Sequence, residues 1–305
     1  MMKKKLKLKN FIKWILLILI IIITIIIVSI NNNNNNNNNN KKNKNKNTKE
    51  TLKINKTKNS DSFKIKCQKI NYCNLKYLDR YKSYKNSNKD LSDEDIITRV
   101  NLGLDYSFYT HTKETPYLNK EYILVNKYLH LNEDYIPENL EDIDLEFARS
   151  GMKLVNTAKE KFLEMAKAAK NDGYTIIAMS SYRSYNYQVN LYNRYASSDG
   201  VEAADTYSGR PGYSEHQTGL AVDVYDGKLN YTDFEKSNSF NWMQENAYKY
   251  GFILRFPKDR DNITGYQYES WHYRYVGKNI AKYIHDKNIT FEEYYVRFIE
   301  PKFQK

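Results

Sequence analysis

The feature that most constrains this 305-residue chain is an apolar run near its start. Residues 14–30 hold no charged side chain and consist mainly of Ile and Leu. Such a run is close to the minimum that a helix needs to span a hydrocarbon core of ~30 Å. Six Lys residues precede it, which favours an N-terminus inside the cell. We therefore predict a basic cytoplasmic N-terminus at residues 1–13, a single transmembrane helix at residues 14–30 and an extracellular remainder.

A cleaved signal peptide is the alternative interpretation of the same run. The apolar part of a signal peptide is usually ~7–15 residues long and is followed by small residues at a cleavage site. The tripeptide Ser29-Ile30-Asn31 offers no such site, and no Cys lies nearby for lipid attachment. These residues favour an uncleaved anchor, although further Lys residues from Lys41 onward weaken the charge argument.

The positive charge of the chain belongs to its N-terminal tail. Residues 1–66 hold 16 Lys against Glu50 and Asp61, a charge of +14, so a net charge of +12 leaves −2 for the rest. The folded part therefore gives no support for nucleic-acid binding, whereas a basic tail can adsorb to anionic lipid. Residues 31–62 are rich in Asn and Lys and have too little apolar content to form a core. We predict a disordered stalk there.

Residues 63–118 are predicted to form a small accessory region to which we assign no role. The segment Leu91-Ser92-Asp93-Glu94-Asp95 has the composition of a helix start, and apolar residues follow it at helical spacing. The region also holds both cysteines of the chain, Cys67 and Cys73. Outside a membrane they could form a short-loop disulfide, and free thiols are the alternative.

Residues 119–305 are predicted to form the main domain. Apolar residues recur every three to four positions from Met152 to Ala169, which predicts an amphipathic helix that Gly173 ends. Further helices are predicted at residues 185–195, 238–250 and 278–286, and strands at residues 174–180, 219–225, 252–256 and 271–276. Because strands and helices mix without regular βαβ alternation, we predict an α+β fold with a small mixed or antiparallel sheet flanked by helices.

One predicted strand carries an unusual carboxylate. In residues 219–225, side chains alternate between two faces, and Asp223 lies on the face opposite Val222 and Val224. A carboxylate in so apolar a strand is costly unless it is paired or bound to a metal. Gly219 permits the chain to fold back, so that His216 in the preceding loop can approach Asp223.

Two of the five histidines have neighbours that suggest a metal site. A lone His is usually structural or solvated, and this is our interpretation of His111, His130 and His285. Together with Asp223, His216 and His272 would offer two imidazoles and one carboxylate, which leaves the fourth position of a catalytic zinc site for water.

Glu269 is the free carboxylate nearest to His272, and it is a candidate base for that water. In a regular strand Glu269 and His272 would face opposite ways, so this assignment requires a turn or bulge between them.

At these residues the chain resembles the bacterial D-alanyl-D-alanine carboxypeptidase family, peptidase family M15 and its subfamily M15B, which includes the vancomycin-resistance carboxypeptidases and dipeptidases. The resemblance covers roughly residues 121–295. The motifs that carry it are Ser214-x-His216-x-x-Gly219-x-Ala221-x-Asp223, Glu269-Ser270-Trp271-His272, Ser181-Tyr182-Arg183-Ser184 with Gln188, and Arg210-Pro211-Gly212. Ser181 replaces the Gly of many relatives, at a position without chemistry.

The resemblance implies a Hedgehog/DD-peptidase-like zinc peptidase fold and a role for each motif residue. One zinc ion per chain would be bound by His216, Asp223 and His272. The base would be Glu269, and Arg183 would hold the terminal carboxylate of the substrate or stabilise the oxyanion. Gln188 and Ser214 would hydrogen-bond near the terminal residue of the substrate.

Each of the substrate-binding residues also has a non-functional interpretation. Arg183 could be a surface-loop arginine, Gln188 part of a solvated helix face and Ser214 a turn or cap residue. Glu215 and Arg210 are interpreted as structural.

The implied function is a zinc-dependent D,D-carboxypeptidase that removes the terminal D-Ala of peptidoglycan stem peptides on the cell-wall side of the membrane. An L,D-carboxypeptidase and a D,D-dipeptidase or endopeptidase acting on the same wall peptides are alternatives, because pocket shape decides specificity. A catalytically inactive wall-binding protein is a further alternative, but no ligand or base is missing. Anionic wall polymers are possible partners of the basic tail.

Overall fold

The computed structural model describes residues 23, 63 and 66–302. The predicted N-terminus, the predicted stalk and all of the predicted anchor except Ile23 lie outside these residues. In the part of the chain that is described, no helix is both long enough and apolar enough to cross a membrane. The residues from Lys66 onward belong to one compact unit.

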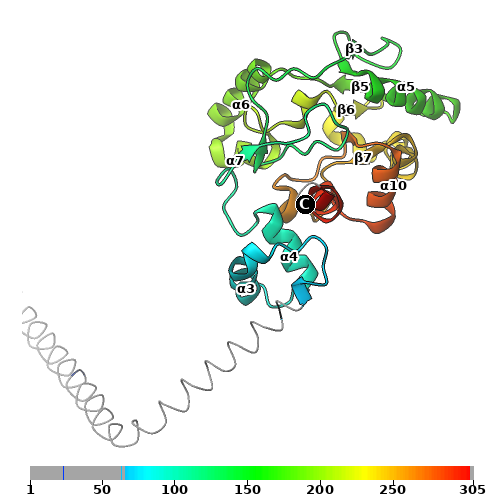
Figure 1. Ribbon diagram of the computed structural model, residues 1–305. Coiled ribbons are helices and arrows are strands. Elements are labelled where there is room, and N and C mark those ends of the chain that lie inside the picture. Colours follow the sequence, from blue (N-terminus) through cyan, green and yellow to red (C-terminus); the bar gives the residue numbers. More distant parts are fainter. Residues whose placement is uncertain (1–22, 24–62, 64–65, 303–305) are drawn as a thin grey trace, which may run out of the picture. The chain divides into compact units, whose positions relative to one another are not determined.

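Short strands and helices alternate irregularly along this unit (Figure 1). Its α-helices are α3 (Leu78–Ser87), α4 (Asp93–Leu102), α5 (Asn156–Asn171), α6 (Tyr185–Asp199), α7 (Val201–Tyr207), α8 (Asn238–Asn246), α9 (Asp261–Thr264), α10 (Lys278–Lys287) and α11 (Phe291–Tyr294). Its strands are β1 (Lys113–Glu114), β2 (Leu129–His130), β3 (Leu140–Asp142), β4 (Lys153–Val155), β5 (Ile177–Ser180), β6 (Ala221–Tyr225), β7 (Phe252–Leu254) and β8 (His272–Tyr275). Short 3-10 helices are η1 (Leu75–Tyr77), η2 (Glu215–Thr218), η3 (Tyr231–Lys236), η4 (Ala247–Tyr250) and η6 (Glu300–Lys302), and η5 (Tyr295–Ile299) is a π-helical turn.

The central sheet has four strands in the order β5-β6-β8-β7, and every neighbouring pair is antiparallel. The predicted α+β class is confirmed. In the β6–β8 pair, Asp223 lies directly opposite His272. In the β5–β6 pair, Asp223 lies opposite Ser180, next to an irregularity in β5 between Ala178 and Ser180. The sheet register therefore brings two predicted ligands side by side.

The main hydrophobic core lies between the sheet and α5, which runs beside β5 and β6 in Figure 1. Val222 and Val224 of β6 are fully buried in this core, together with Phe162 and Met165 of α5. The predicted alternation along β6 is thus confirmed, since Asp223 faces a cavity on the other side of the sheet.

The start of the predicted helix at Met152 is wrong, because α5 begins only at Asn156. Residues Lys153–Val155 instead form β4, which pairs with β3 in antiparallel register. The backbone of Val155 has a ψ of 138° and is not helical, because pairing with β3 is favoured here over one more turn of helix. The predicted end is confirmed, since Gly173 has a φ of +87° just after the helix.

Other boundaries differ by a few residues from those that the sequence predicts. Helix α6 continues to Asp199, where Gly200 with a φ of +86° ends it. The predicted helix at 238–250 is α8 followed by the 3-10 turn η4. The four strands of the sheet are one to three residues shorter at one or both ends than predicted.

The predicted accessory region packs against the C-terminal helices. Leu102 at the end of α4 belongs to a second hydrophobic cluster together with Ile284 of α10 and Phe291 of α11. The Nε of Arg297 in η5 donates a hydrogen bond of 3.1 Å to Thr98 Oγ1 in α4. In the same region Cys67 and Cys73 form a disulfide, which resolves the alternative that the sequence left open.

Candidate active site

The turn η2 and the residue after it place His216 beside β6. Gly219 has a φ of +67°, which ends η2 and redirects the chain into the strand. A Cβ at this position would lie 2.9 Å from side-chain atoms of Leu140 and of Val155. Only glycine fits such a close approach with a left-handed backbone.

The His216 ring is oriented by a backbone carbonyl. Its Nδ1 lies 2.7 Å from the carbonyl oxygen of Ser181, which can only accept a hydrogen bond. Nδ1 therefore carries the proton, and Nε2, 3.4 Å from Asp223 Oδ1, presents its lone pair to the interior of the site. This is the form of imidazole that binds a metal.

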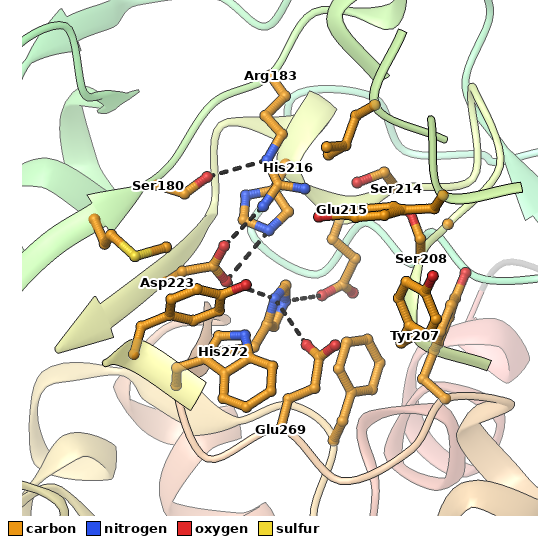
Figure 2. A pocket seen from close by; sticks show the side chains of 18 of the residues that line it. Ser180, Arg183, Tyr207, Ser208, Ser214, Glu215, His216, Asp223, Glu269 and His272 are labelled. Carbon is orange, nitrogen blue, oxygen red and sulfur yellow. Dashed lines mark hydrogen bonds and ion pairs between the residues drawn. The ribbon is translucent and has the colours of Figure 1, made fainter. Parts of the chain in front are cut away.

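His216, Asp223 and His272 converge as a buried cluster (Figure 2). Nδ1 of His272 lies 3.1 Å from Asp223 Oδ1. The three candidate ligand atoms all lie within 4.8 Å of one another. Asp223 Oδ1 is buried and has no hydrogen-bond partner among the described residues, although unpaired buried oxygens are costly. A metal ion at the centre of this cluster would satisfy that oxygen, so the residues fit a zinc ion.

The pKa shifts of the clustered residues bear on whether they can bind a cation. Burial and the Arg183 charge lower the pKa of His216 to about 4, which keeps the ring neutral. Burial opposes the charge on Asp223, yet His216, His272 and Arg183 lower its pKa well below the ordinary value. Burial also opposes the charge on His272, but the neighbouring carboxylates of Asp223 and Glu215 raise its pKa to about 9. Metal binding should therefore release a proton from His272.

Glu269 lies just before β8, at the edge of the same cluster. A turn at Ser270 and Trp271 separates it from the strand, as its predicted role requires. Its Oε2 lies 3.6 Å from His272 Nδ1, and Figure 2 shows the carboxylate directed at the cluster. Burial raises the pKa of Glu269 to about 8, which is near the range of an effective general base at neutral pH.

Arg183 is tied into the site and is not a free surface arginine. Its Nη2 donates a hydrogen bond of 2.7 Å to Asp223 Oδ2, and its Nε donates one of 3.0 Å to Ser180 Oγ. Gln188, predicted beside the substrate, is buried and does not line the cavity. Its Oε1 accepts a 3.5 Å contact from Arg183 Nη1, and its Nε2 donates to the carbonyl of Gly209 at 2.8 Å. Gln188 thus supports Arg183 from behind.

Ser214 lines the cavity at the start of η2. It occupies the N-cap position, but its side chain makes no capping hydrogen bond. Its side chain therefore has no capping role and lies at the wall of the cavity. Arg210, interpreted as structural, is paired with Asp205 at 2.7 Å. The other three histidines lie outside the cluster: His111 and His285 are exposed, and His130 is half-buried near Tyr213.

The cavity has a volume of about 510 Å³ and opens beside the cluster. Several aromatic side chains form part of its walls, which the sequence motifs did not reveal. The aromatic residues that line it include Tyr187, Tyr195, Tyr207, Tyr213, Tyr231 and Trp271. Tyr231 and Trp271 meet edge to face, with ring centroids 5.2 Å apart. In a chain with 29 Tyr, no pattern in the sequence distinguishes these residues from the others.

The sequence analysis also missed a buried ionic network behind the candidate ligands. Oε1 of Glu215 accepts hydrogen bonds from Arg255 Nε at 2.8 Å and from Arg274 Nη1 at 2.9 Å. Arg255 also donates two hydrogen bonds to Glu292 of α11, at 2.9 and 2.5 Å. The sequence analysis interpreted Glu215 as structural and assigned no role to Arg255 and Arg274, which lie inside predicted strands. A charged residue inside an otherwise apolar strand was the available signal.

An antiparallel sheet that holds a buried His–Asp–His cluster beside a carboxylate is typical of a metallopeptidase. A family model described as D-alanyl-D-alanine carboxypeptidase matches residues 151–278. YodJ of Bacillus subtilis (strain 168) is 41% identical over 182 residues, which are 56% of this chain and 66% of YodJ. A D-alanyl-D-alanine carboxypeptidase of Enterococcus faecium is 40% identical over 136 residues, 44% of this chain and 41% of that protein.

Among solved structures, that of the LdcB LD-carboxypeptidase is 41% identical with a TM-score of 0.54, and the match covers 57% of this chain and 85% of that chain. This chain belongs to the D-alanyl-D-alanine carboxypeptidase family. The match spans less than two thirds of the length of the two curated relatives.

Proposed function

We propose that this protein is a zinc-dependent carboxypeptidase that hydrolyses the terminal D-Ala from peptidoglycan stem peptides. The observation that carries the proposal is the buried cluster of His216, Asp223 and His272, with Glu269 at the same cavity. Family membership supports the same reading. One zinc ion per chain would be held by the two imidazoles and by the Asp223 carboxylate, through the oxygen that has no other partner.

Zinc, when bound, would polarise the scissile carbonyl and acidify a water molecule. The residues of the chain supply the remaining functions. Glu269 would take the proton of the attacking water on its carboxylate and pass it to the leaving amine of D-Ala. The side chain of Glu269 is almost fully buried, so this proton has no easy escape to bulk solvent.

Arg183 and Ser214 would bind the end of the substrate. Arg183 uses Nη2 and Nε for Asp223 and Ser180, while Nη1 makes only a 3.5 Å contact with Gln188. Nη1 is therefore the group that would donate to the terminal carboxylate or to the developing oxyanion. The hydroxyl of Ser214, which has no capping role, would add a hydrogen bond on the same side.

The test is a digestion of purified stem peptides by the full-length chain. We expect release of free D-Ala from a pentapeptide ending in D-Ala-D-Ala, loss of this activity with a chelator and recovery with zinc. The products are identified by mass spectrometry. A chain that binds zinc but leaves the pentapeptide intact would contradict the proposed substrate.

A second candidate is L,D-carboxypeptidase activity on a tetrapeptide stem, which the likeness to the LdcB LD-carboxypeptidase structure favours. A D,D-dipeptidase or an endopeptidase is a further alternative. Parallel digestions of matched pentapeptide, tetrapeptide, free D-Ala-D-Ala and cross-linked peptide separate these activities. The ratio of kcat/KM between pentapeptide and tetrapeptide decides between the first two.

We also propose that residues 14–30 anchor the chain in the cytoplasmic membrane and that the compact unit works on the wall side. The sequence supports this through the apolar run and the Lys residues before it. The basic tail would adsorb to anionic lipids or wall polymers. Protease treatment of intact, wall-stripped cells should release the catalytic part, whereas protection until lysis would contradict this topology.

A further inference from the structure

The two ring nitrogens of His272 lie in different surroundings. Nδ1 faces the ligand cluster, 3.1 Å from Asp223 Oδ1. Nε2 lies on the other side of the ring, 3.6 Å from Glu215 Oε2. Both Nε2 and this oxygen are buried, and neither has a hydrogen-bond partner within residues 66–302. Two unpaired buried polar atoms at this separation point to an interaction between them, because each alone would be costly.

Neighbouring arginines determine which oxygen of Glu215 faces His272. Arg255 and Arg274 both donate to Oε1, at 2.8 and 2.9 Å, so Oε2 is left for the histidine. The rest of the Arg255 guanidinium is taken by Glu292 of α11. All four side chains of this network are buried, so the Glu215 carboxylate cannot swing into solvent. Figure 2 shows Glu215 on the side of His272 away from Asp223.

We propose that Glu215 is a positioning residue for the zinc site, which accepts the Nε2–H of His272 and thereby keeps the lone pair on Nδ1. A neutral imidazole carries one N–H, so a partner at one nitrogen decides which nitrogen can bind a metal. Metal-binding histidines usually donate their other N–H to a carboxylate or carbonyl. The inference rests on the zinc site of the proposed function. It adds to that site a role for Glu215, the residue next to the proposed ligand His216.

The substitution Glu215→Gln tests this because it replaces the hydrogen-bond acceptor that faces His272 Nε2 with a donor. The two arginines require an oxygen, so the Gln carbonyl would remain on their side and its NH₂ group would face His272. A donor facing Nε2 favours the tautomer with the proton on Nδ1, which cannot bind zinc. Loss of such a partner typically weakens metal binding ~10–100-fold. We therefore expect at least about tenfold weaker zinc binding.

Glu292→Gln is the matched control. It makes the same chemical change in the same buried network and replaces one of the two oxygens that accept from Arg255, but it does not face His272. Zinc affinity of the full-length chain is measured by competition with a chromophoric chelator, and thermal unfolding of the metal-free chain is measured in parallel. Both variants should unfold at lower temperature, whereas only Glu215→Gln should lose zinc affinity.

A second measurement needs no variant and holds even if Glu215→Gln does not fold. Nitrogen-15 NMR of the zinc-loaded wild type should place the proton of His272 on Nε2 and the metal on Nδ1. Zinc on Nε2, or zinc affinities of the two variants within threefold of each other, would overturn the inference and leave the proposed zinc site standing. A wild-type chain that binds no zinc would overturn both.

Discussion

At the scale of single residues, the two oxygens of Asp223 have different tasks. Oδ2 accepts a short hydrogen bond from Arg183, whereas Oδ1 faces the two histidines without a hydrogen-bond partner among the described residues. A carboxylate fixed through one oxygen cannot rotate away when the other is needed as a ligand. The arginine therefore contributes to the geometry of the cluster before any substrate is bound.

Glu269→Gln should separate proton transfer from metal binding. The amide cannot accept the proton of the attacking water, so turnover of the pentapeptide should fall ~10²–10⁴-fold. Zinc content, measured by elemental analysis, should stay at the wild-type level because Glu269 is not a proposed ligand. Glu245→Gln, the same change at an exposed position of α8, is the control and should leave both quantities unchanged. Turnover of Glu269→Gln within threefold of wild type would exclude Glu269 as the base.

Arg183→Ala should affect both the substrate and the metal. Loss of the donor to Asp223 Oδ2 should weaken zinc binding, and loss of Nη1 should reduce the preference for a peptide with a free terminal carboxylate over its amide. Arg183→Lys is the informative comparison, because one ammonium cannot serve Asp223, Ser180 and a substrate together. Rates on acid and amide substrates at saturating zinc separate the two effects. An unchanged acid-to-amide ratio would rule out the substrate role.

The cluster of His216, Asp223 and His272 was predictable from the sequence, but the residues that surround it were not. A carboxylate in an apolar strand next to a histidine motif stands out without any coordinates, as Asp223 does. Glu215, Arg255 and Glu292 are far apart along the chain, and each looks like an ordinary charged residue. Their burial follows from packing between η2, β7 and α11, which no local pattern records. Gln188 was assigned to the substrate, yet it is buried behind Arg183 for the same reason.

At the scale of elements, the site depends on a short turn that meets the central sheet. The turn η2 carries His216, β6 carries Asp223, and Gly219 joins the two. The sequence predicted the strands and helices of the sheet region because their periodicity is strong. It misplaced the start of α5 because residues before Asn156 have helical spacing but pair with β3, and this pairing is a tertiary contact.

Gly219→Ala should destabilise the protein and weaken the site together. A left-handed backbone costs a non-glycine residue ~1–2 kcal/mol, and the clash with Leu140 and Val155 should add an overpacking cost of ~1–3 kcal/mol. Gly173→Ala is the control, since Gly173 has a φ of +87° but no neighbouring atom within 4 Å. Urea unfolding should show a larger loss for Gly219→Ala, and its zinc affinity should also fall. Equal losses for the two variants would show that the clash is relieved.

At the scale of the whole molecule, the predicted accessory region is part of the compact unit. Helix α4 shares a hydrophobic cluster with α10 and α11. The loop after α4 reaches the site as well, because the ring of Tyr109 packs edge to face on Tyr213, with centroids 5.2 Å apart. Tyr213 in turn lines the cavity. No pattern in the sequence indicates these contacts, since residues 63–118 lie outside the motifs.

Replacement of both Cys67 and Cys73 by Ser should lower stability without affecting the site. Their sequence separation is 6, and closing so short a loop in the unfolded chain is worth about 2 kcal/mol in the chain-entropy account. Neither residue lines the cavity, so zinc affinity should be unchanged. The measurement is urea unfolding of the variant and of the wild type with and without a reductant. If the reduced wild type and the variant both match the oxidised wild type, the bridge does not stabilise the fold.

The hydrogen bond between Arg297 and Thr98 joins residues that are 199 positions apart. Contacts between residues so far apart in the sequence form late in folding, because the chain between them must first be in place. Helix α4 emerges early from a ribosome, while its partner η5 is almost the last described element to appear. The second hydrophobic cluster thus stays open until synthesis is nearly complete. The proposed location on the wall side would require the chain to remain unfolded while it passes through a membrane channel. This topology would postpone its final closure until nearly all of the chain had passed.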